Sequence, residues 1–236
     1  MKKHEKRLSA PKAMPIKRKA YKFVAKVRPG PHPRDLSVPL VVLLRDMLNV
    51  VKTRYEAKRI LSDGLVYVDG RRVKDLKFPV GFMDVISFKD IDDVYRVLVD
   101  RKGRITSFKT DKKERNIKLV RINNKTTVKN GRIQLNMHDG RNILADDTIK
   151  SLKVGDVLKI EVPSQKILEK AEMKPGSTVY IFRGKHSGLK ARIKEIRVFD
   201  SPEDNVAVFE ADGDVYETKV DYLFVIGEKE DMIHIG

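Results

Sequence analysis

The chain has 236 residues, carries 50 Lys and Arg against 33 Asp and Glu, and contains no cysteine, which excludes disulfides, thiolate zinc sites and cysteine nucleophiles. No apolar run approaches the roughly 20 residues of a membrane span, and the N-terminus lacks the apolar region of a signal peptide. We therefore expect an intracellular protein without a membrane segment, whose formal charge of +17 requires a polyanionic partner, by default a nucleic acid.

The excess positive charge is unevenly distributed along the chain. The formal charge is +10 in residues 1–38, +3 in residues 39–102, +8 in residues 103–170 and −4 in residues 171–236. These composition shifts suggest four parts, of which the first is the most basic.

The first part is predicted to be a basic extended tail. It contains five prolines and no sustained periodicity, so it cannot bury enough apolar surface to fold alone. Tyr21 and Phe23 lie among its lysines, and such a segment can follow phosphates while its aromatic rings stack on bases. The alternative is a disordered tail that only improves solubility.

Two short helices are predicted next. Leucine and methionine recur at helical spacing from Leu40 to Leu48, after a proline suited to a first turn, so this helix is expected to end near Asn49. Thr53 and Glu56 have the spacing of a capping box for a second helix, and the pair Asp63-Gly64 predicts its end.

A β-hairpin should follow the second helix. Residues 65–68 form an apolar strand, Asp69-Gly70 is a hairpin-turn signal, residues 71–73 form the return strand, and residues 84–88 form a further strand. The helix then has an apolar side and an opposite side with Arg54, Tyr55, Lys58 and Arg59. That side is either an RNA-binding face or an ordinary solvated helix face.

The stretch TRYEAKRILSDGLVYVDGRRV resembles the RNA-binding module of small-subunit ribosomal protein four and several RNA-modifying enzymes. The resemblance covers roughly residues 40–90. It implies that the helix and hairpin hold structured RNA by shape and phosphate contacts, as A-form RNA requires, through Arg54, Lys58, Arg59, Arg71 and Arg72.

The remaining parts are predicted to be β-structure. Alternating segments occur at residues 117–122, 132–137 and 157–162, separated by Asn-Gly and Asp-Gly turns, which suggests a small central β domain. Residues 178–182, 191–198, 206–209 and 215–218 predict a compact SH3-like barrel with a basic glycine loop between its first two strands.

The glycine loop, RGKHSGLK, resembles the KOW motif of ribosomal proteins and transcription-elongation factors. The resemblance implies contacts with RNA or a protein surface through Lys185, His186 and Lys190. The alternative is a solvated hairpin tip.

The order of these parts resembles the S-four-e family of small-subunit ribosomal proteins found in archaea and eukaryotes. The stretches KKHEKRLSAPK and GPHPRDLSVPLVVLLRD extend the resemblance through the tail, although Ala13-Met14 stands where that family usually carries a Trp. The resemblance implies a structural constituent of the small ribosomal subunit in the cytoplasm, with rRNA and neighbouring ribosomal proteins as partners.

The predicted fold class is α+β and multidomain. It comprises a basic extension (1–38), an S-four-like RNA-binding domain (39–102), a central β domain (103–170) and a KOW/SH3-like barrel (171–236). The residues expected to contact RNA are Lys2, Lys3, Lys6, Arg7, Lys12, Lys17, Arg18, Lys19, Lys22, Arg54, Lys58, Arg59, Arg71, Arg72, Lys185, His186 and Lys190.

An enzyme is not expected. The five histidines are too dispersed for a metal site, and no phosphate-binding glycine motif lies between a strand and a helix, so no cofactor, metal or small-molecule substrate is predicted. Two alternatives remain open: an accessory subunit of an RNA-modifying enzyme, and a KOW-type transcription-elongation factor.

Overall fold

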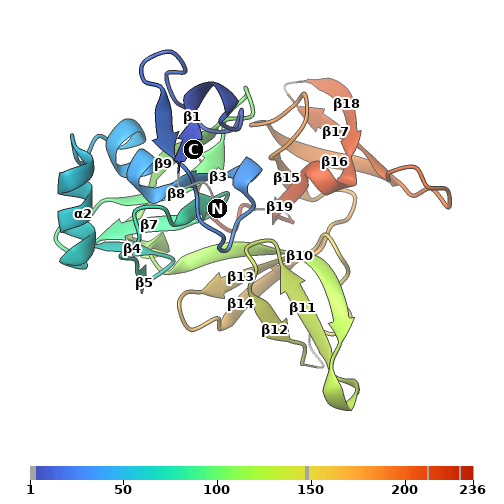
Figure 1. The fold of residues 1–236 in the computed structure, drawn as a ribbon. Coiled ribbons are helices and arrows are strands. Elements are labelled where there is room, and N and C mark those ends of the chain that lie inside the picture. The colour runs from blue at the N-terminus through green and yellow to red at the C-terminus, as the bar shows by residue number, and fades with distance from the viewer. Residues whose placement is uncertain (1–3, 147–148, 212, 229, 236) are drawn as a thin grey trace. The chain divides into compact units, whose positions relative to one another are not determined.

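Short strands joined by glycine turns dominate the structure, as the alternating apolar pattern predicts, and the few helices are short (Figure 1). The computed structural model describes residues 4–146, 149–211, 213–228 and 230–235. Two units divide the chain: one holds residues 1–100, 104–118 and 235–236, and the other holds residues 101–103 and 119–234. No helix in the described residues is both long enough and apolar enough to cross a membrane.

The two predicted helices are present in the first unit. The leucine-rich segment forms α1 (Leu40–Val42), continues as a π-helical turn (Leu43–Met47) and stops at Asn49, whose φ of 55° is left-handed. The second helix is α2 (Arg54–Ser62), and the hydroxyl of Thr53 accepts the Glu56 N–H at 3.1 Å, so the predicted cap is confirmed.

The predicted hairpin is also confirmed. Strands β4 (Val66–Val68) and β5 (Arg71–Arg72) pair antiparallel across a turn in which Asp69 and Gly70 have φ values of 49° and 70°. Two successive positive φ angles define the type I′ turn, which matches the twist of the paired strands.

The hairpin belongs to a five-stranded antiparallel sheet in the order β5-β4-β7-β8-β9. The strands beyond the hairpin are β7 (Val85–Phe88), β8 (Val94–Val99) and β9 (Ile105–Thr110). Two smaller antiparallel pairs complete the unit, formed by β1 (His4–Lys6) with β2 (Phe23–Ala25) and by β3 (Ser37–Pro39) with β6 (Pro79–Gly81).

The described part of the segment predicted as a basic extended tail, residues 1–38, packs against the rest of the first unit. Its residues form β1 and β2, and Met14, only 2% exposed, lies in the same apolar core as Leu40 and Leu61. The segment folds because it buries its few apolar side chains against the rest of the unit, although it could not do so alone. Met14, at the departure from the family pattern, is therefore a core residue.

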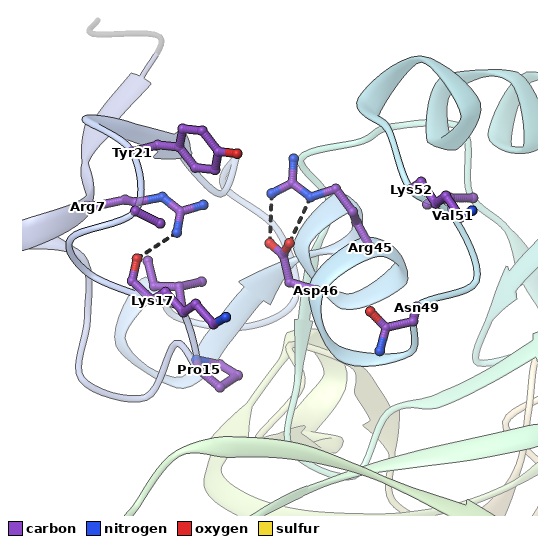
Figure 2. A pocket seen from close by; sticks show the side chains of 11 residues that line it. Arg7, Pro15, Lys17, Tyr21, Arg45, Asp46, Asn49, Val51 and Lys52 are labelled. Carbon is purple, nitrogen blue, oxygen red and sulfur yellow. Dashed lines mark hydrogen bonds and ion pairs between the residues drawn. The ribbon is translucent and has the colours of Figure 1, made fainter.

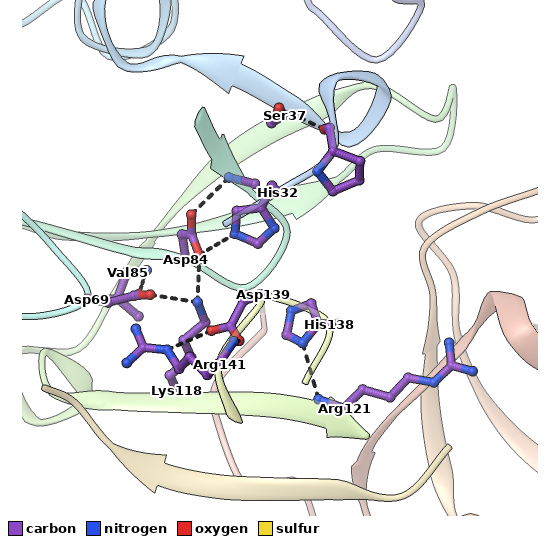
Figure 3. A network of polar contacts seen from close by, with 12 residues as sticks. His32, Ser37, Asp69, Asp84, Val85, Lys118, Arg121, His138, Asp139 and Arg141 are labelled. Atoms are coloured by element: carbon purple, nitrogen blue, oxygen red, sulfur yellow. Dashed lines mark hydrogen bonds and ion pairs between the residues drawn. The ribbon is translucent and has the colours of Figure 1, made fainter. Parts of the chain in front are cut away.

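The first unit also extends beyond the predicted boundary at residue 102. Strand β9 pairs with β8 along six residues, and the unit continues to Lys118. Lys118 is fully buried, and its ammonium group lies 2.6 Å from both the Asp69 and the Asp84 carboxylates (Figure 3). The Asp84 carboxylate also lies 2.7 Å from Nε2 of His32.

This buried network connects four segments that are distant in sequence. Burial acts to raise the pKa of Asp84, but the charges of His32 and Lys118 and their hydrogen bonds outweigh it and hold that pKa below its ordinary value. The close approach of His32 requires the adjacent Gly81, because a β-carbon there would lie 2.3 Å from the imidazole ring. The network therefore attaches the N-terminal segment, the hairpin turn and the end of the unit to one another.

The second unit contains two five-stranded sheets. The first has the order β12-β11-β10-β13-β14 and surrounds a core that includes Val120, Leu135 and Ile160. Its strands are β10 (Ile117–Thr127, which begins in the first unit), β11 (Ile133–Met137), β12 (Asn142–Leu144), β13 (Val157–Glu161) and β14 (Ile167–Ala171).

The second sheet has the order β18-β17-β16-β15-β19. Its strands are β15 (Thr178–Ile181), β16 (Lys190–Arg197), β17 (Val206–Ala211), β18 (Asp214–Lys219) and β19 (Leu223–Gly227). Four of these strands fall on segments predicted from the sequence. The last, β19, was not predicted because all five of its residues are buried, so it shows no apolar–polar alternation.

Candidate nucleic-acid interface

Four cationic side chains without acidic partners lie on α2 and the adjoining hairpin. Arg54, Lys58 and Arg59 are exposed on the helix, and Arg71 is exposed on β5. The salt bridges of the described residues include none of these four side chains, so their charge is available to an external anion. We call these residues, together with Arg72 and Tyr67, the helix–hairpin face.

Arg72 is positioned by the glycine that ends α2. Gly64 has a φ of +69°, and a β-carbon at that position would lie 2.5 Å from Cδ of Arg72. The absence of a side chain at Gly64 therefore lets the Arg72 stem cross the end of the helix. The same glycine ends the helix and brings the hairpin close to it.

Tyr67 lies among three cations at the hairpin. The Arg72 guanidinium donates a long hydrogen bond of 3.4 Å to the Tyr67 hydroxyl, and the guanidinium carbons of Arg72 and Arg115 lie 5.9 and 6.0 Å from the ring centre. The hydrogen bond from Arg72, together with the charges of Arg72, Lys89 and Arg115, holds the pKa of Tyr67 below its ordinary value. Cations gathered around one ring make the local potential positive, which favours an anionic ligand.

Sequence reasoning did not identify Tyr67 as part of this face, nor Lys89 and Arg115 as the cations near it. The alternation in β4 contains a signal for Tyr67, because Val66 and Val68 are buried and the residue between them must point to the opposite side. No local signal identifies Arg115, which reaches the hairpin through tertiary structure and donates to the Phe88 carbonyl at 3.1 Å.

The predicted RNA-binding residues of the N-terminal segment differ in exposure. Lys2 and Lys3 lie outside the described residues, whereas the exposed members are Lys6, Lys12, Lys17, Lys19 and Lys22. Arg7 is only 5% exposed and donates to the carbonyl of Lys17 at 2.8 Å, and Arg18 donates to the Pro11 carbonyl at 2.7 Å. These two arginines stabilise the fold of the segment, so we remove them from the candidate interface.

The three predicted residues of the glycine loop also differ in their surroundings. Lys185 is exposed, whereas the His186 ring packs against Tyr216 and Phe209 with centres 4.5 and 5.8 Å apart. Lys190 forms an ion pair with Asp231. Of these three residues, Lys185 presents the most accessible positive charge.

No group of three or more His, Cys, Asp or Glu side chains that could hold a metal ion was found where the structure describes the chain. The helix–hairpin face is instead suited to phosphate and shape recognition, since it combines exposed guanidinium and ammonium groups with one partly exposed aromatic ring. Its helix, glycine and hairpin define an S4-type RNA-binding domain, and the S4 domain model matches residues 38–86.

Two further family models match the parts on either side of this domain. The RS4NT (NUC023) domain matches residues 1–35, and Ribosomal family S4e matches residues 91–167. The chain is 45% identical to small ribosomal subunit protein eS4 of Methanothermobacter thermautotrophicus over 234 residues, covering 99% of this chain and 96% of the relative. The protein belongs to the S4e family of ribosomal proteins.

Other relatives agree with this assignment. Small ribosomal subunit protein eS4 of Methanocaldococcus jannaschii is 43% identical over 240 residues, covering 99% of this chain and 98% of the relative. The crystal structure of the 30S ribosomal protein S4e from Thermoplasma acidophilum is similar with a TM-score of 0.71 and 38% identity, covering 82% of this chain and 96% of that chain.

Proposed function

We propose that this protein is a structural constituent of the small ribosomal subunit, located in the cytoplasmic ribosome, and that it binds rRNA through the helix–hairpin face. The observation that carries this proposal is the group of exposed cations without acidic partners on α2 and β5. The family of the chain supports the ribosomal setting, because its relatives are named as small-subunit proteins.

The chemistry of the face favours the phosphate backbone over base edges. Arg54 and Lys58 are one helical turn apart, so their side chains lie on one side of α2. Arg71 adds a third charge from the hairpin, and a folded RNA offers phosphates at several positions on one surface. Phosphate contacts of this kind make affinity depend on salt, with a slope of roughly 0.7 to 0.9 per contact.

The other parts contribute further contacts in this proposal. The exposed lysines of the N-terminal segment lie along additional rRNA phosphates. The C-terminal sheet is an SH3-like barrel of KOW type, supported by its five antiparallel strands and by the positive φ angles of Gly184 and Gly188 on either side of Lys185. It contacts rRNA or a neighbouring ribosomal protein. Residues 171–236 carry a net charge of −4 despite the basic loop, which favours a local contact over general adhesion.

A charge-reversal pair tests the proposal. Arg54→Glu with Lys58→Glu should weaken binding to small-subunit rRNA at about 0.15 M salt and lower the slope of log affinity against log salt. The matched control is Lys129→Glu with Arg132→Glu, which makes the same change in charge at two exposed residues of the second unit. Equal affinity losses in the two double variants would show that only total charge matters.

Sedimentation distinguishes the proposal from the other function classes. A structural constituent should remain stoichiometric with small ribosomal subunits through a high-salt wash. A protein that washes off, or that is present in much smaller amounts than the subunit, would instead be a factor or an enzyme accessory.

A further inference from the structure

A groove of about 710 Å³ lies between the N-terminal segment and the first helix of the first unit (Figure 2). One wall contains Lys17 and Tyr21, and the other contains Arg45, Asn49 and Lys52. The volume falls within the range of roughly 300 to 1,000 Å³ typical of small-ligand sites. We call this hollow the Tyr21 groove.

Tyr21 is exposed and lies beside a buried arginine. It is 74% exposed, and the guanidinium carbon of Arg7 lies 5.3 Å from its ring centre. Arg7 is itself buried and donates to the Lys17 carbonyl at 2.8 Å. One cation held by the backbone therefore lies near the ring and favours its orientation, while the rest of the ring stays accessible to a stacking ligand.

The groove also has a positive lining. Lys17 and Lys52 are exposed on opposite walls, and no acidic group lies within ion-pair distance of their side chains among the described residues. Arg45 is paired with Asp46 through two hydrogen bonds of 2.8 and 2.7 Å, so these two charges offset each other. Each wall of the groove therefore carries an exposed ammonium group, although the charge of Lys52 is partly offset by Glu56, whose carboxylate accepts the Lys52 backbone N–H at 2.8 Å.

We propose that the Tyr21 groove binds one unpaired nucleotide of RNA, with its base stacked on Tyr21 and the adjoining phosphates on Lys17 and Lys52. This inference rests on the proposed RNA-binding function and specifies that the site binds single-stranded RNA. A paired base is already stacked within its helix and cannot lie against the ring, whereas an unpaired base in a loop or bulge can. The amide of Asn49 offers a donor and an acceptor for the edge of the base.

Binding of a short oligouridylate tests the groove, with a blunt RNA duplex as the comparison probe. Tyr21→Ala should weaken oligouridylate binding by about 5- to 150-fold, while Tyr21→Phe should stay within about twofold of the unchanged protein because it retains the ring. Affinity for the duplex should change little in either variant. Phe199→Leu is the control, because Phe199 is an exposed aromatic residue of the second unit.

Ultraviolet crosslinking provides a second measurement that does not depend on the stability of the variants. Oligouridylate bound to the unchanged full chain should crosslink to the peptide that contains Tyr21. Equal oligouridylate affinity in Tyr21→Ala and the unchanged protein, or crosslinks confined to other peptides, would overturn the inference. If the protein binds the duplex and rRNA but not oligouridylate, the inference about the groove is wrong and the proposed function stands. If it binds no RNA, the proposed function is wrong as well.

Discussion

Replacing Lys118 should strongly destabilise the first unit. Lys118 is fully buried, and its ammonium group lies 2.6 Å from the carboxylates of both Asp69 and Asp84. Lys118→Met keeps an unbranched side chain of similar length but removes the charge. Two buried carboxylates then lose the cation that they share. Because removing one partner of a buried ion pair costs about 3 to 5 kcal/mol, we expect a loss of that order in the free energy of unfolding.

Hydrogen exchange is the appropriate assay, because the chain has two units and no tryptophan to report on either of them. The free energy of opening should be taken from the slowest-exchanging amides of β7 and β8, which lie in the sheet of the first unit. Lys113→Met is the matched control, since Lys113 is exposed. A loss below about 1 kcal/mol in Lys118→Met would refute the reasoning, because that is the size of a surface ion pair.

The network also predicts how acid affects stability. Since the pKa of Asp84 is lower in the folded state, its ionisation stabilises the fold fully above the unfolded value of about 3.9, and this contribution is lost as the pH falls below that value. Lys118→Met removes one of the charges that lower the pKa. The variant should therefore lose less additional stability than the unchanged protein when the pH is lowered from about 6 to about 3, and an equal acid-dependent loss would contradict this.

Three further substitutions test local features of the first unit. Thr53→Ala removes the helix cap and should lower the stability of α2 by about 0.5 to 2 kcal/mol, measured by exchange of its amides, whereas no change would rule out the cap as a stabilising contact. Gly64→Ala places a β-carbon at positive φ against the Arg72 stem. It should lower the free energy of unfolding of the first unit by more than about 1 kcal/mol and weaken rRNA binding. Unchanged stability and affinity would contradict the close contact between Gly64 and Arg72. Met14→Ala should lower the free energy of unfolding of the first unit by about 2 to 5 kcal/mol, measured by urea denaturation. Leu8→Ala, at a residue 75% exposed, should change that free energy little, and equal effects of the two variants would contradict the burial of Met14.

The elements that could be predicted from the sequence are those specified by neighbouring residues. The cap at Thr53, the helix end at Gly64 and the turn at Asp69-Gly70 each depend on a backbone conformation and on contacts within a few positions. The cations of α2 could be assigned to one side of the helix because helical periodicity alone places them there.

The N-terminal segment shows where local reasoning fails. Its proline content and charge predict an extended chain, yet Met14 is buried and Arg7 is held by backbone carbonyls. Burial of Met14 depends on apolar surface that other parts of the unit provide, whereas Arg7 is held by the Lys17 carbonyl ten positions further along the same segment. The Tyr21 groove likewise requires two segments that are separated in sequence.

The sequence by itself determined the helix–hairpin element and its basic side, because these follow from periodicity, capping and turn conformation over short distances. Only the tertiary structure decided which charges are exposed and which are buried. Lys58 and Lys118 are the same residue type, but one faces solvent and the other is enclosed with Asp69 and Asp84. The physical reason is that burial of a charge depends on partners brought together from distant segments, and local sequence does not specify those partners.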